Sequence, residues 1–300
     1  MNSENRILFE KPDLATLRKR YTVVDMHFHS RYSDGKNRVR TIAEKSRKLG
    51  IGVAITDHNE IAGAVRINEN KKVLSIPGVE VTSREGTHIL IYFYDIKSLK
   101  AFYGKAIKPH RGDNVMSSIA LPMEEIIHHA RKYNTVIVFP HPYCAAYTGV
   151  CNHHFPEKRL RRLWRRIDGV EVINSENLKK WNLKCAVLGF NLNKSITGGS
   201  DGHRLYQLGK VVSYGECKNN RKAFLDMVKR RENKVTGREI AMFSKMTSNG
   251  YKLKRNIKNC PDIFEKNIRY GYTVINSKSK QIRDNVKRHI NGRMKRAGFR

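Results

Sequence analysis

Histidine and carboxylate side chains recur in this chain at the ends of short apolar segments. The first segment, 23–30, holds Asp25, His27 and His29 at alternate positions. Alternate residues of a strand point to the same side, so the two imidazoles are directed at one point. A second apolar segment ends on His58. Histidines and carboxylates that converge at the ends of successive strands are the ligands that a metal-dependent hydrolase needs.

The same combination continues along the chain. The full set of candidate ligands is His27, His29, Asp34, His58, Glu80, His88, His141, Asp201 and His203. A single histidine is more often a hydrogen-bonded structural residue than a ligand. A whole set of such groups at strand ends would be electrostatically costly without cations to bind them. We therefore predict a site for divalent metal ions.

Alternating strands and helices would position these side chains. The strand at 23–30 is followed by a helix over Thr41–Leu49, which Gly50 ends, and by the strand that leads to His58. This order builds parallel sheets. Further strands are expected at 72–77, which leads into 78–82, and at 88–93, 135–139, 169–174 and 211–214, and residues 195–203 are expected to form a strand that ends in a loop. Helices are expected at 13–20, 123–133, 178–190, 221–231 and from Pro156 onward. Residues 99–118 are expected to form a surface loop.

The charge of the chain indicates an anionic partner. Its 300 residues include 59 Lys and Arg against 27 Asp and Glu, which gives a formal net charge of +32. Such a field attracts polyanions, so nucleic acid, nucleotides or an anionic surface are the natural partners. A lysine-rich proteome would also explain the total, but not its clustering. The length fits one α/β barrel with an appendage as well as two domains.

Two segments concentrate this charge. One is an arginine-rich helix at 158–166, and the other is the basic stretch 241–300, expected to be partly helical around 280–294. Both are candidate contacts for nucleic acid, because binding to a phosphate backbone requires little besides positive charge. A charge run is also commonly just the solvated face of a helix.

The remaining composition is typical of a soluble cytoplasmic protein. The N-terminal residues lack an apolar segment, and no later stretch is apolar for the roughly 18 residues that a membrane span needs. The cysteines are scattered, form no Cys-x-x-Cys pair and are odd in number, which argues against a disulfide framework. They are Cys144, Cys151, Cys185, Cys217 and Cys260.

Six short motifs occur in order along the chain. They are Asp25-Met26-His27-Phe28-His29, Asp34-Gly35, Ile55-Thr56-Asp57-His58, Pro77-Gly78-Val79-Glu80, Phe139-Pro140-His141-Pro142 and Ser200-Asp201-Gly202-His203. Together they resemble the polymerase and histidinol phosphatase (PHP) phosphoesterases. The resemblance covers about residues 22–240 and implies a distorted (β/α)7 barrel of the PHP type. A lead-in at 1–21 would precede this domain, and a basic, partly helical extension at 241–300 would follow it.

The resemblance also implies two to three divalent ions at the C-terminal mouth of the barrel. One ion would be held by His27, His29, Glu80 and Asp201, a second by Glu80, His88 and His141 with Glu80 bridging, and a third by Asp34, His58 and His203. The separation of Glu80 and His88 is shorter than the family pattern. Mixed histidine and carboxylate sites suit Mn, Fe or Zn better than Mg or Ca.

Clustered divalent ions favour hydrolysis of a phosphate ester by a metal-bound hydroxide that attacks phosphorus. Candidate substrate-binding residues lie in loops near the ligands, although each could equally be solvated surface charge; they are Arg31, Arg84, His110 and Arg111. Asp25 and Asp57 are expected to orient the neighbouring histidines as hydrogen-bond acceptors. Asn174 is expected to be a structural cap rather than a substrate contact.

We therefore predict a metal-dependent hydrolase, a phosphoesterase acting on nucleotides or short nucleic-acid 5′ ends. It would be either a nucleotide phosphatase or a 5′-3′ exonuclease. One alternative is a small-molecule phosphatase of the histidinol-phosphate type. Another is a nucleic-acid-binding protein in which the metal site is structural and the basic extension makes the contacts.

Overall fold

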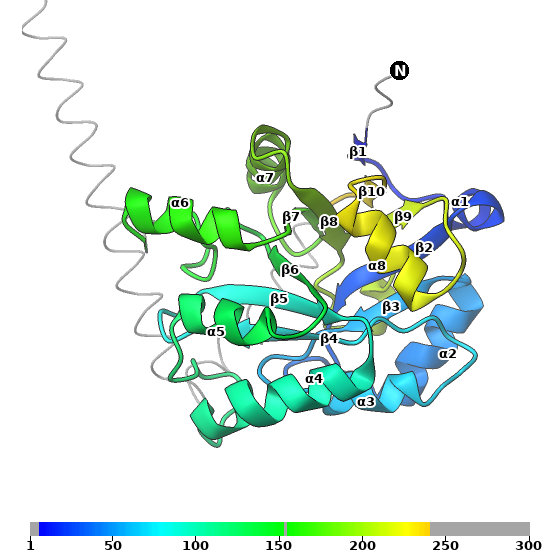
Figure 1. Ribbon diagram of the computed structural model, residues 1–300. Coiled ribbons are helices and arrows are strands. Elements are labelled where there is room, and N and C mark those ends of the chain that lie inside the picture. Colours follow the sequence, from blue (N-terminus) through cyan, green and yellow to red (C-terminus); the bar gives the residue numbers. More distant parts are fainter. Residues whose placement is uncertain (1–5, 153–154, 241–300) are drawn as a thin grey trace, which may run out of the picture.

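The structure is a computed structural model that describes residues 6–152 and 155–240 (Figure 1). The strands are β1 (Ile7–Leu8), β2 (Thr22–Phe28), β3 (Gly52–Ile55), β4 (Gly78–Thr82), β5 (His88–Phe93), β6 (Thr135–Phe139), β7 (Gly169–Asn174), β8 (Ser195–Gly199), β9 (Val211–Gly215) and β10 (Lys234–Gly237). The α-helices are α1 (Leu14–Arg20), α2 (Val39–Leu49), α3 (Ala62–Asn68), α4 (Ile96–Phe102), α5 (Met123–Ala130), α6 (Glu157–Arg166), α7 (Lys179–Asn191) and α8 (Arg221–Lys229). The predicted extension at 241–300, with its helix around 280–294, lies outside the described residues.

The strands form two five-stranded sheets at the centre of the molecule, and the helices lie around them (Figure 1). The strand orders are β1-β10-β9-β2-β3 and β4-β5-β6-β7-β8. Parallel pairs such as β2/β3 and β7/β8 occur beside antiparallel pairs such as β2/β9 and β4/β5. The mixed α/β class is confirmed, but the strands that the structure describes do not form a closed (β/α)7 barrel.

The two sheets approach each other at two seams. Single parallel bridges join Phe28 to Gly202 at one seam and His58 to Glu80 at the other. The continuous ladders end there because the chain leaves extended conformation: φ is 47° at Asn59 and 49° at Asp201. The two sheets therefore do not join into a closed barrel at these seams, and the candidate ligands lie at the same seams.

Apolar residues fill both sides of the strands. All seven residues of β2 are buried, which fits a central strand covered on both faces. The predicted helix after it is confirmed as α2, whose buried Val39, Ile42, Ala43 and Ser46 form one face. Gly50 ends this helix with φ of 69°, a left-handed conformation that glycine adopts without steric cost.

Two elements were predicted wrongly. Residues 72–77 do not form a strand, since only Ser75 pairs, in a single bridge to Val53. The segment expected to be a loop at 99–118 is largely helical up to His110: α4 is followed by a π-helix at Tyr103–Ile107 and a 3₁₀ helix at Lys108–His110. The buried residues Leu99, Phe102, Ala106 and Ile107 recur at helical spacing, and their burial stabilises these turns.

Candidate metal centre

The structure brings all nine predicted ligand side chains into one cluster at the seams between the sheets. His27 belongs to β2, and His29 and Asp34 follow it; His58 follows β3, Glu80 lies in β4, His88 begins β5, His141 follows β6, and Asp201 and His203 follow β8. Backbone hydrogen bonds fix this meeting point. The His29 N–H donates to Gly202 O at 2.9 Å, and the Asp201 N–H donates to His27 O at 2.7 Å.

Glu80 lies at the centre of the cluster. The carboxylate is fully buried, and each of its oxygens faces imidazole nitrogens. Its Oε2 lies 3.3 Å from His27 Nε2, 3.4 Å from His29 Nε2 and 3.2 Å from His58 Nδ1, while its Oε1 lies 2.9 Å from His88 Nδ1 and 3.5 Å from His141 Nε2. A carboxylate placed between two groups of nitrogens has the arrangement required of a bridging ligand.

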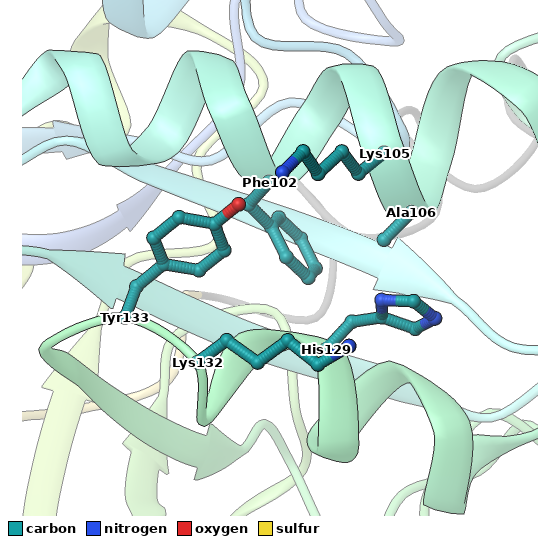
Figure 2. A pocket seen from close by; sticks show the side chains of 6 residues that line it. All are labelled: Phe102, Lys105, Ala106, His129, Lys132 and Tyr133. Carbon is teal, nitrogen blue, oxygen red and sulfur yellow. The ribbon is translucent and has the colours of Figure 1, made fainter.

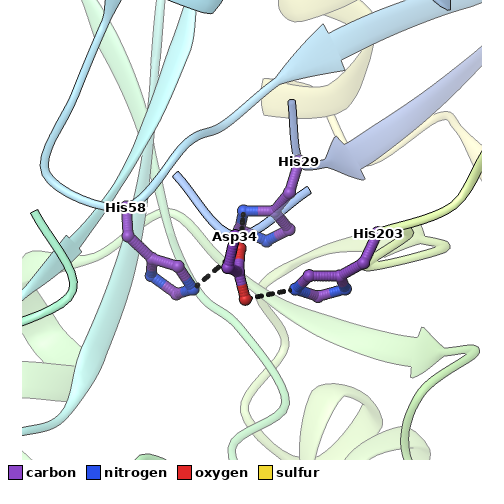
Figure 3. Close-up of side chains that lie close together, drawn as sticks. All are labelled: His29, Asp34, His58 and His203. Carbon is purple, nitrogen blue, oxygen red and sulfur yellow. Dashed lines mark ion pairs between the residues drawn. The ribbon is translucent and has the colours of Figure 1, made fainter. Parts of the chain in front are cut away.

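The other two carboxylates extend the cluster along the first seam. Asp201 Oδ1 lies 3.0 Å from His29 Nε2. Asp34 Oδ2 lies 2.7 Å from His203 Nε2, and its Oδ1 lies 3.9 Å from His58 Nε2 (Figure 3). His29 contacts both carboxylates, because its Nδ1 also lies 3.4 Å from Asp34 Oδ1. The His29 ring stacks on the rings of His58 and His203, with 4.6 Å between centroids in each pair.

Three groups in this cluster have ligand atoms close enough to share an ion. They are His29, Asp34, His58 and His203; His27, His29 and Asp201; and His58, Glu80 and His88, with ligand atoms within 4.8 Å of one another in each group. None of the three groups equals a set implied by the family resemblance: the first also includes His29, the second lacks Glu80, and the third has His58 in place of His141. Assignment of individual ions to these groups remains a prediction.

The nitrogen and oxygen atoms of the cluster are better placed to contact cations than to hydrogen-bond with one another. His27 Nε2 and His29 Nε2 face each other at 3.1 Å. Buried polar atoms of the cluster have no partner in hydrogen-bond geometry among the described residues; they include His58 Nδ1, Glu80 Oε1, His88 Nδ1 and His203 Nε2. Leaving buried polar atoms unpaired is costly. Divalent ions coordinated by these lone pairs would remove that cost.

The cluster strongly perturbs its own protonation. Burial alone would raise the pKa of Glu80 and Asp201, but the surrounding imidazoles hold both well below the ordinary carboxyl value. Burial works against the charged form of His27 too, yet Asp201, Glu171 and Glu80 raise its pKa well above the usual value. Burial instead lowers the pKa of His58 to about 3. Opposite shifts in adjacent groups are typical of functional sites.

Backbone strain is concentrated at the same place. His141 and Asp201 have φ of 30° and 49°, a region that residues with a Cβ rarely occupy. Asn59, next to His58, has φ of 47° and holds its neighbours through its side chain: Nδ2 donates to Val115 O and Ser117 O, each at 2.9 Å. Such strain persists where the surrounding structure enforces it, commonly at functional sites.

Sequence reasoning missed Glu171 as a member of this site. Its Oε1 lies 2.9 Å from His27 Nδ1, and its Oε2 accepts from the His141 N–H at 3.0 Å and from Asn174 Nδ2 at 2.9 Å. A carboxylate on the far nitrogen of an imidazole fixes which nitrogen faces the ion. Glu171 lies in β7, which is buried throughout and holds no candidate ligand, so no signal in the sequence marked it.

Asp25 and Asp57 do not have the predicted role. Asp25 accepts from Ser200 N, Ser200 Oγ, Gly209 N and the backbone N–H of His27 rather than from an imidazole. Asp57 accepts from Ser30 N at 2.7 Å and from Ser30 Oγ at 2.6 Å. Burial raises the pKa of both, that of Asp25 to about 6, against the effect of these hydrogen bonds. They brace the segments that carry the ligands.

Asn174 is not a helix cap, since α7 begins after Leu178. Its Nδ2 donates to Glu171 Oε2 and, at 3.2 Å, to Asp201 Oδ2, which links two site carboxylates. Asn174 therefore supports the site from behind through its amide group.

The predicted substrate-binding residues are divided. Arg111 is engaged within the protein: its Nη1 donates to Glu60 Oε2 at 2.8 Å and to Asn59 O at 3.0 Å. Partly buried His110 places Nδ1 3.1 Å from Ala106 O. Arg31 and Arg84 are exposed. Substrate contact stays a prediction for all four of these residues, and Arg111 has a clear structural role as well.

Residues 25–146 match the PHP domain family. This segment of the chain is therefore similar to a PHP domain. It contains the ordered motifs from Asp25 to His141, and the Asp201 and His203 positions follow beyond the matched residues.

Similar proteins extend the comparison beyond that segment. An uncharacterised protein of Methanocaldococcus jannaschii is 26% identical over 166 residues, which cover 50% of this chain and 81% of that protein. A two-domain protein of Bacteroides vulgatus containing a predicted PHP-like metal-dependent phosphoesterase is 16% identical with a TM-score of 0.55, over 79% of this chain and 70% of that one.

A lesion-specific endonuclease of Pyrococcus furiosus, PfuEndoQ, has a similar fold. It is 18% identical with a TM-score of 0.58, and the match covers 72% of this chain and 57% of the endonuclease. Endonuclease Q in complex with a 27-mer duplex substrate gives a TM-score of 0.57 at 18% identity, over 73% of this chain and 60% of that one. At these identities the similarity establishes the fold.

Other features bear on the predicted class of protein. Cys144, Cys151, Cys185 and Cys217 are all unpaired, whereas Cys260 lies outside the described residues. None of the helices within 6–152 and 155–240 combines the length and apolar character of a membrane span.

A separate pocket of about 280 Å³ lies between the segment after α4 and the end of α5, and no candidate ligand lines it (Figure 2).

Proposed function

We propose that this protein is a PHP-type metal-dependent phosphoesterase that acts on nucleotides or short nucleic-acid 5′ ends, as a phosphatase or a 5′-3′ exonuclease. The observation that carries the proposal is the position of Glu80. Its two oxygens face five imidazoles in a buried site that also holds Asp34 and Asp201. A site of this composition fits more than one divalent ion of the Mn, Fe or Zn type.

The chain's own residues would prepare the site for catalysis. Bound divalent ions would supply an activated water and neutralise charge on the phosphoryl oxygens. Glu80 would offer oxygen ligands to the ions, and Glu171 would keep the His27 proton on Nδ1, so that the Nε2 lone pair faces the cluster. The braces made by Asp25 and Asp57 would keep the ligand-bearing segments in register, so that the substrate phosphate meets a preorganised site.

Two observations support a nucleotide or nucleic-acid substrate. The net charge of +32 favours polyanionic ligands. A protein of similar fold, Endonuclease Q, forms a complex with a 27-mer duplex substrate that has an abasic lesion at the active site. A sugar or amino-alcohol phosphate would interact with less of this positive charge than a nucleic acid would.

The test is a metal analysis joined to a substrate panel. Purified protein is analysed for bound metals, and phosphate release and 5′-end shortening are assayed with added Mn on nucleotides, bisphosphate nucleotides, oligonucleotides and histidinol phosphate. We expect two to three ions per chain and turnover on a nucleotide or a nucleic-acid end. His58→Ala should lose this activity, while His128→Ala, which alters an exposed histidine of α5, should retain it.

Other results would point elsewhere. Turnover restricted to histidinol phosphate would indicate a small-molecule phosphatase. Protein that binds nucleic acid but hydrolyses no ester with any divalent metal would refute the enzymatic proposal and favour a binding protein with a structural metal site.

A further inference from the structure

A second concave surface lies beside the candidate metal centre, and we call it the arginine groove. Its volume is about 710 Å³. The residues that give it its chemistry are Arg31, Tyr32, Arg38, Arg40, Arg66 and Glu69. They come from the turn after β2, from α2 and from α3 with the residue after it, so three consecutive parts of the chain form one surface.

The groove is strongly cationic. Four arginines line it, and Glu69 is the acidic residue among its lining groups. Arg40 is paired with Glu44 one turn further along α2, at 2.9 Å. Arg31, Arg38 and Arg66 are exposed. Exposed guanidinium groups on neighbouring elements repel one another, and a polyanion in the groove would relieve that repulsion.

An aromatic ring lies among these charges. The Tyr32 ring is half-buried, and the guanidinium carbon of Arg66 lies 5.5 Å from its centroid. Arginine binds phosphate oxygens through paired N–H groups, and contact with the Tyr32 ring helps to hold the Arg66 guanidinium in the groove. The groove therefore offers a positioned cation to a phosphate group.

The groove and the metal centre share a wall, the turn at 30–37. In this turn Asp34 contacts His203 in the cluster, whereas Arg31 and Tyr32 line the groove. The turn is fixed at both ends: the Arg31 N–H donates to Asn37 O at 3.0 Å, and the Lys36 N–H donates to His203 O at 2.8 Å. A chain of phosphates could thus extend from one site into the other.

We propose that the arginine groove binds the sugar–phosphate backbone of a single-stranded nucleic acid whose reacting phosphate lies at the candidate metal centre. The inference rests on the proposed phosphoesterase function and narrows its substrate from a free nucleotide to a strand. A volume of about 710 Å³ is in the range of sites for small ligands, which corresponds to a few nucleotides rather than a duplex.

The test compares two double variants with the same change in net charge. Arg38→Glu with Arg66→Glu reverses charge in the groove. Arg162→Glu with Arg165→Glu does the same on exposed positions of α6, which lies at the upper left of Figure 1, away from α2 and α3 at the lower right. Affinity for a labelled single-stranded oligothymidylate of about twelve nucleotides is measured by fluorescence anisotropy on the full chain in EDTA, over a range of salt concentrations.

We expect the groove variant to bind the oligonucleotide at least about tenfold more weakly than the wild type. The slope of its affinity against salt concentration should decrease by an amount that corresponds to about two phosphate contacts. The α6 variant should bind nearly as well as the wild type. Equal losses in both variants would mean that binding follows net charge, and no loss in either would mean that the strand lies elsewhere. A groove-dependent loss seen only with a duplex would also overturn the proposal.

The readout is independent of catalysis because EDTA prevents metal-dependent hydrolysis. If the wild type hydrolyses no phosphoester with added metal but the groove variant still loses affinity, the proposed function fails while the groove remains a strand-binding surface. If hydrolysis occurs on oligonucleotides and the groove variant binds normally, only the groove inference fails.

Discussion

Two sets of carboxylates lie in and around the candidate metal centre and differ in their partners. Asp25 and Asp57 are surrounded by hydroxyl groups and backbone N–H groups, and burial raises their pKa. Glu80, Asp34 and Asp201 are surrounded by imidazoles, which hold their pKa well below the ordinary value. The first set is satisfied by the protein alone, whereas the second presents lone pairs to a shared space.

The difference in partners separates carboxylates that hold the fold together from carboxylates that are expected to bind cations. Ser200 gives Asp25 two hydrogen bonds, and Ser30 does the same for Asp57, so each carboxylate closes a local structure. Two of the nitrogens that Glu80 contacts, His27 Nε2 and His29 Nε2, also face each other at 3.1 Å. Both sets present the same functional group, so we expect the partners to decide which carboxylate holds the fold and which one binds a cation. The predictions below test that division.

The largest effect is expected from Glu80→Gln. The substitution keeps the size of the side chain but removes the charge that faces five imidazoles. Metal content should fall. Losing a residue that supports a metal ligand costs up to about a hundredfold in activity, and Glu80 is itself an expected ligand, so kcat/KM should drop by more than about a hundredfold. Elemental analysis and phosphoesterase assays measure both. A variant with full metal content and activity would place the binding site elsewhere.

Glu171→Gln should have the next largest effect. An amide can still contact His27 Nδ1 but carries no charge to polarise the ring, so metal affinity should fall about tenfold to a hundredfold while the fold is kept. Metal titration by calorimetry measures the change, and Glu176→Gln serves as a control because that residue accepts a hydrogen bond from Gln207 and is not among the candidate ligands. Unchanged affinity would show that Glu171 is a structural residue only.

Asp25→Asn should act on stability rather than on metal content. The amide nitrogen would face donors where the carboxylate accepts from Ser200 and Gly209, so one or two buried hydrogen bonds are lost. The free energy of unfolding should decrease by roughly 1–3 kcal/mol. Denaturant unfolding measures this, and metal bound per folded chain should stay at the wild-type value. A loss of metal without a loss of stability would remove the distinction between the two sets.

The meeting of the candidate ligands was predictable because they are chemically distinctive residues within or close to apolar strands. The sequence does not mark Glu171 in this way, because β7 is buried throughout and no candidate ligand adjoins it. The bracing by Asp25 was misjudged for a related reason. Its partners, Ser200 and Gly209, are distant in sequence and are brought close only by the folded structure.

The same limit applies to the fold. Strand β6 and helix α2 were predicted well because their apolar patterns are continuous. Residues 99–110 were predicted to be a loop, since Lys and Gly lie between the apolar positions, but burial of Phe102 and Ala106 against the core stabilises helical turns. Closure of the sheets depends on backbone conformation at Asn59 and Asp201, which strand patterns do not show.

The smallest effect needs no substitution and concerns pH. The pKa values of His27, His29 and His141 are raised by nearby carboxylate or thiol groups against the effect of burial, whereas burial lowers that of His58 to about 3. A raised imidazole pKa gives stability that is complete below the unfolded value of about 6.5 and is lost as pH rises through the folded value. With three groups raised and one lowered, metal-free protein should lose stability above about pH 6.5.

Metal ions compete with these protons, so the stabilisation that they give should grow over the same range. Thermal unfolding in EDTA and in added Mn, from about pH 6.5 to about pH 8.5, measures the difference in Tm. We expect this difference to increase with pH in the wild type and to be small throughout in Glu80→Gln. A difference that is constant or decreases with pH would mean that the imidazoles facing Glu80 do not exchange protons for metal, and the division between bracing and binding carboxylates would lose its electrostatic basis.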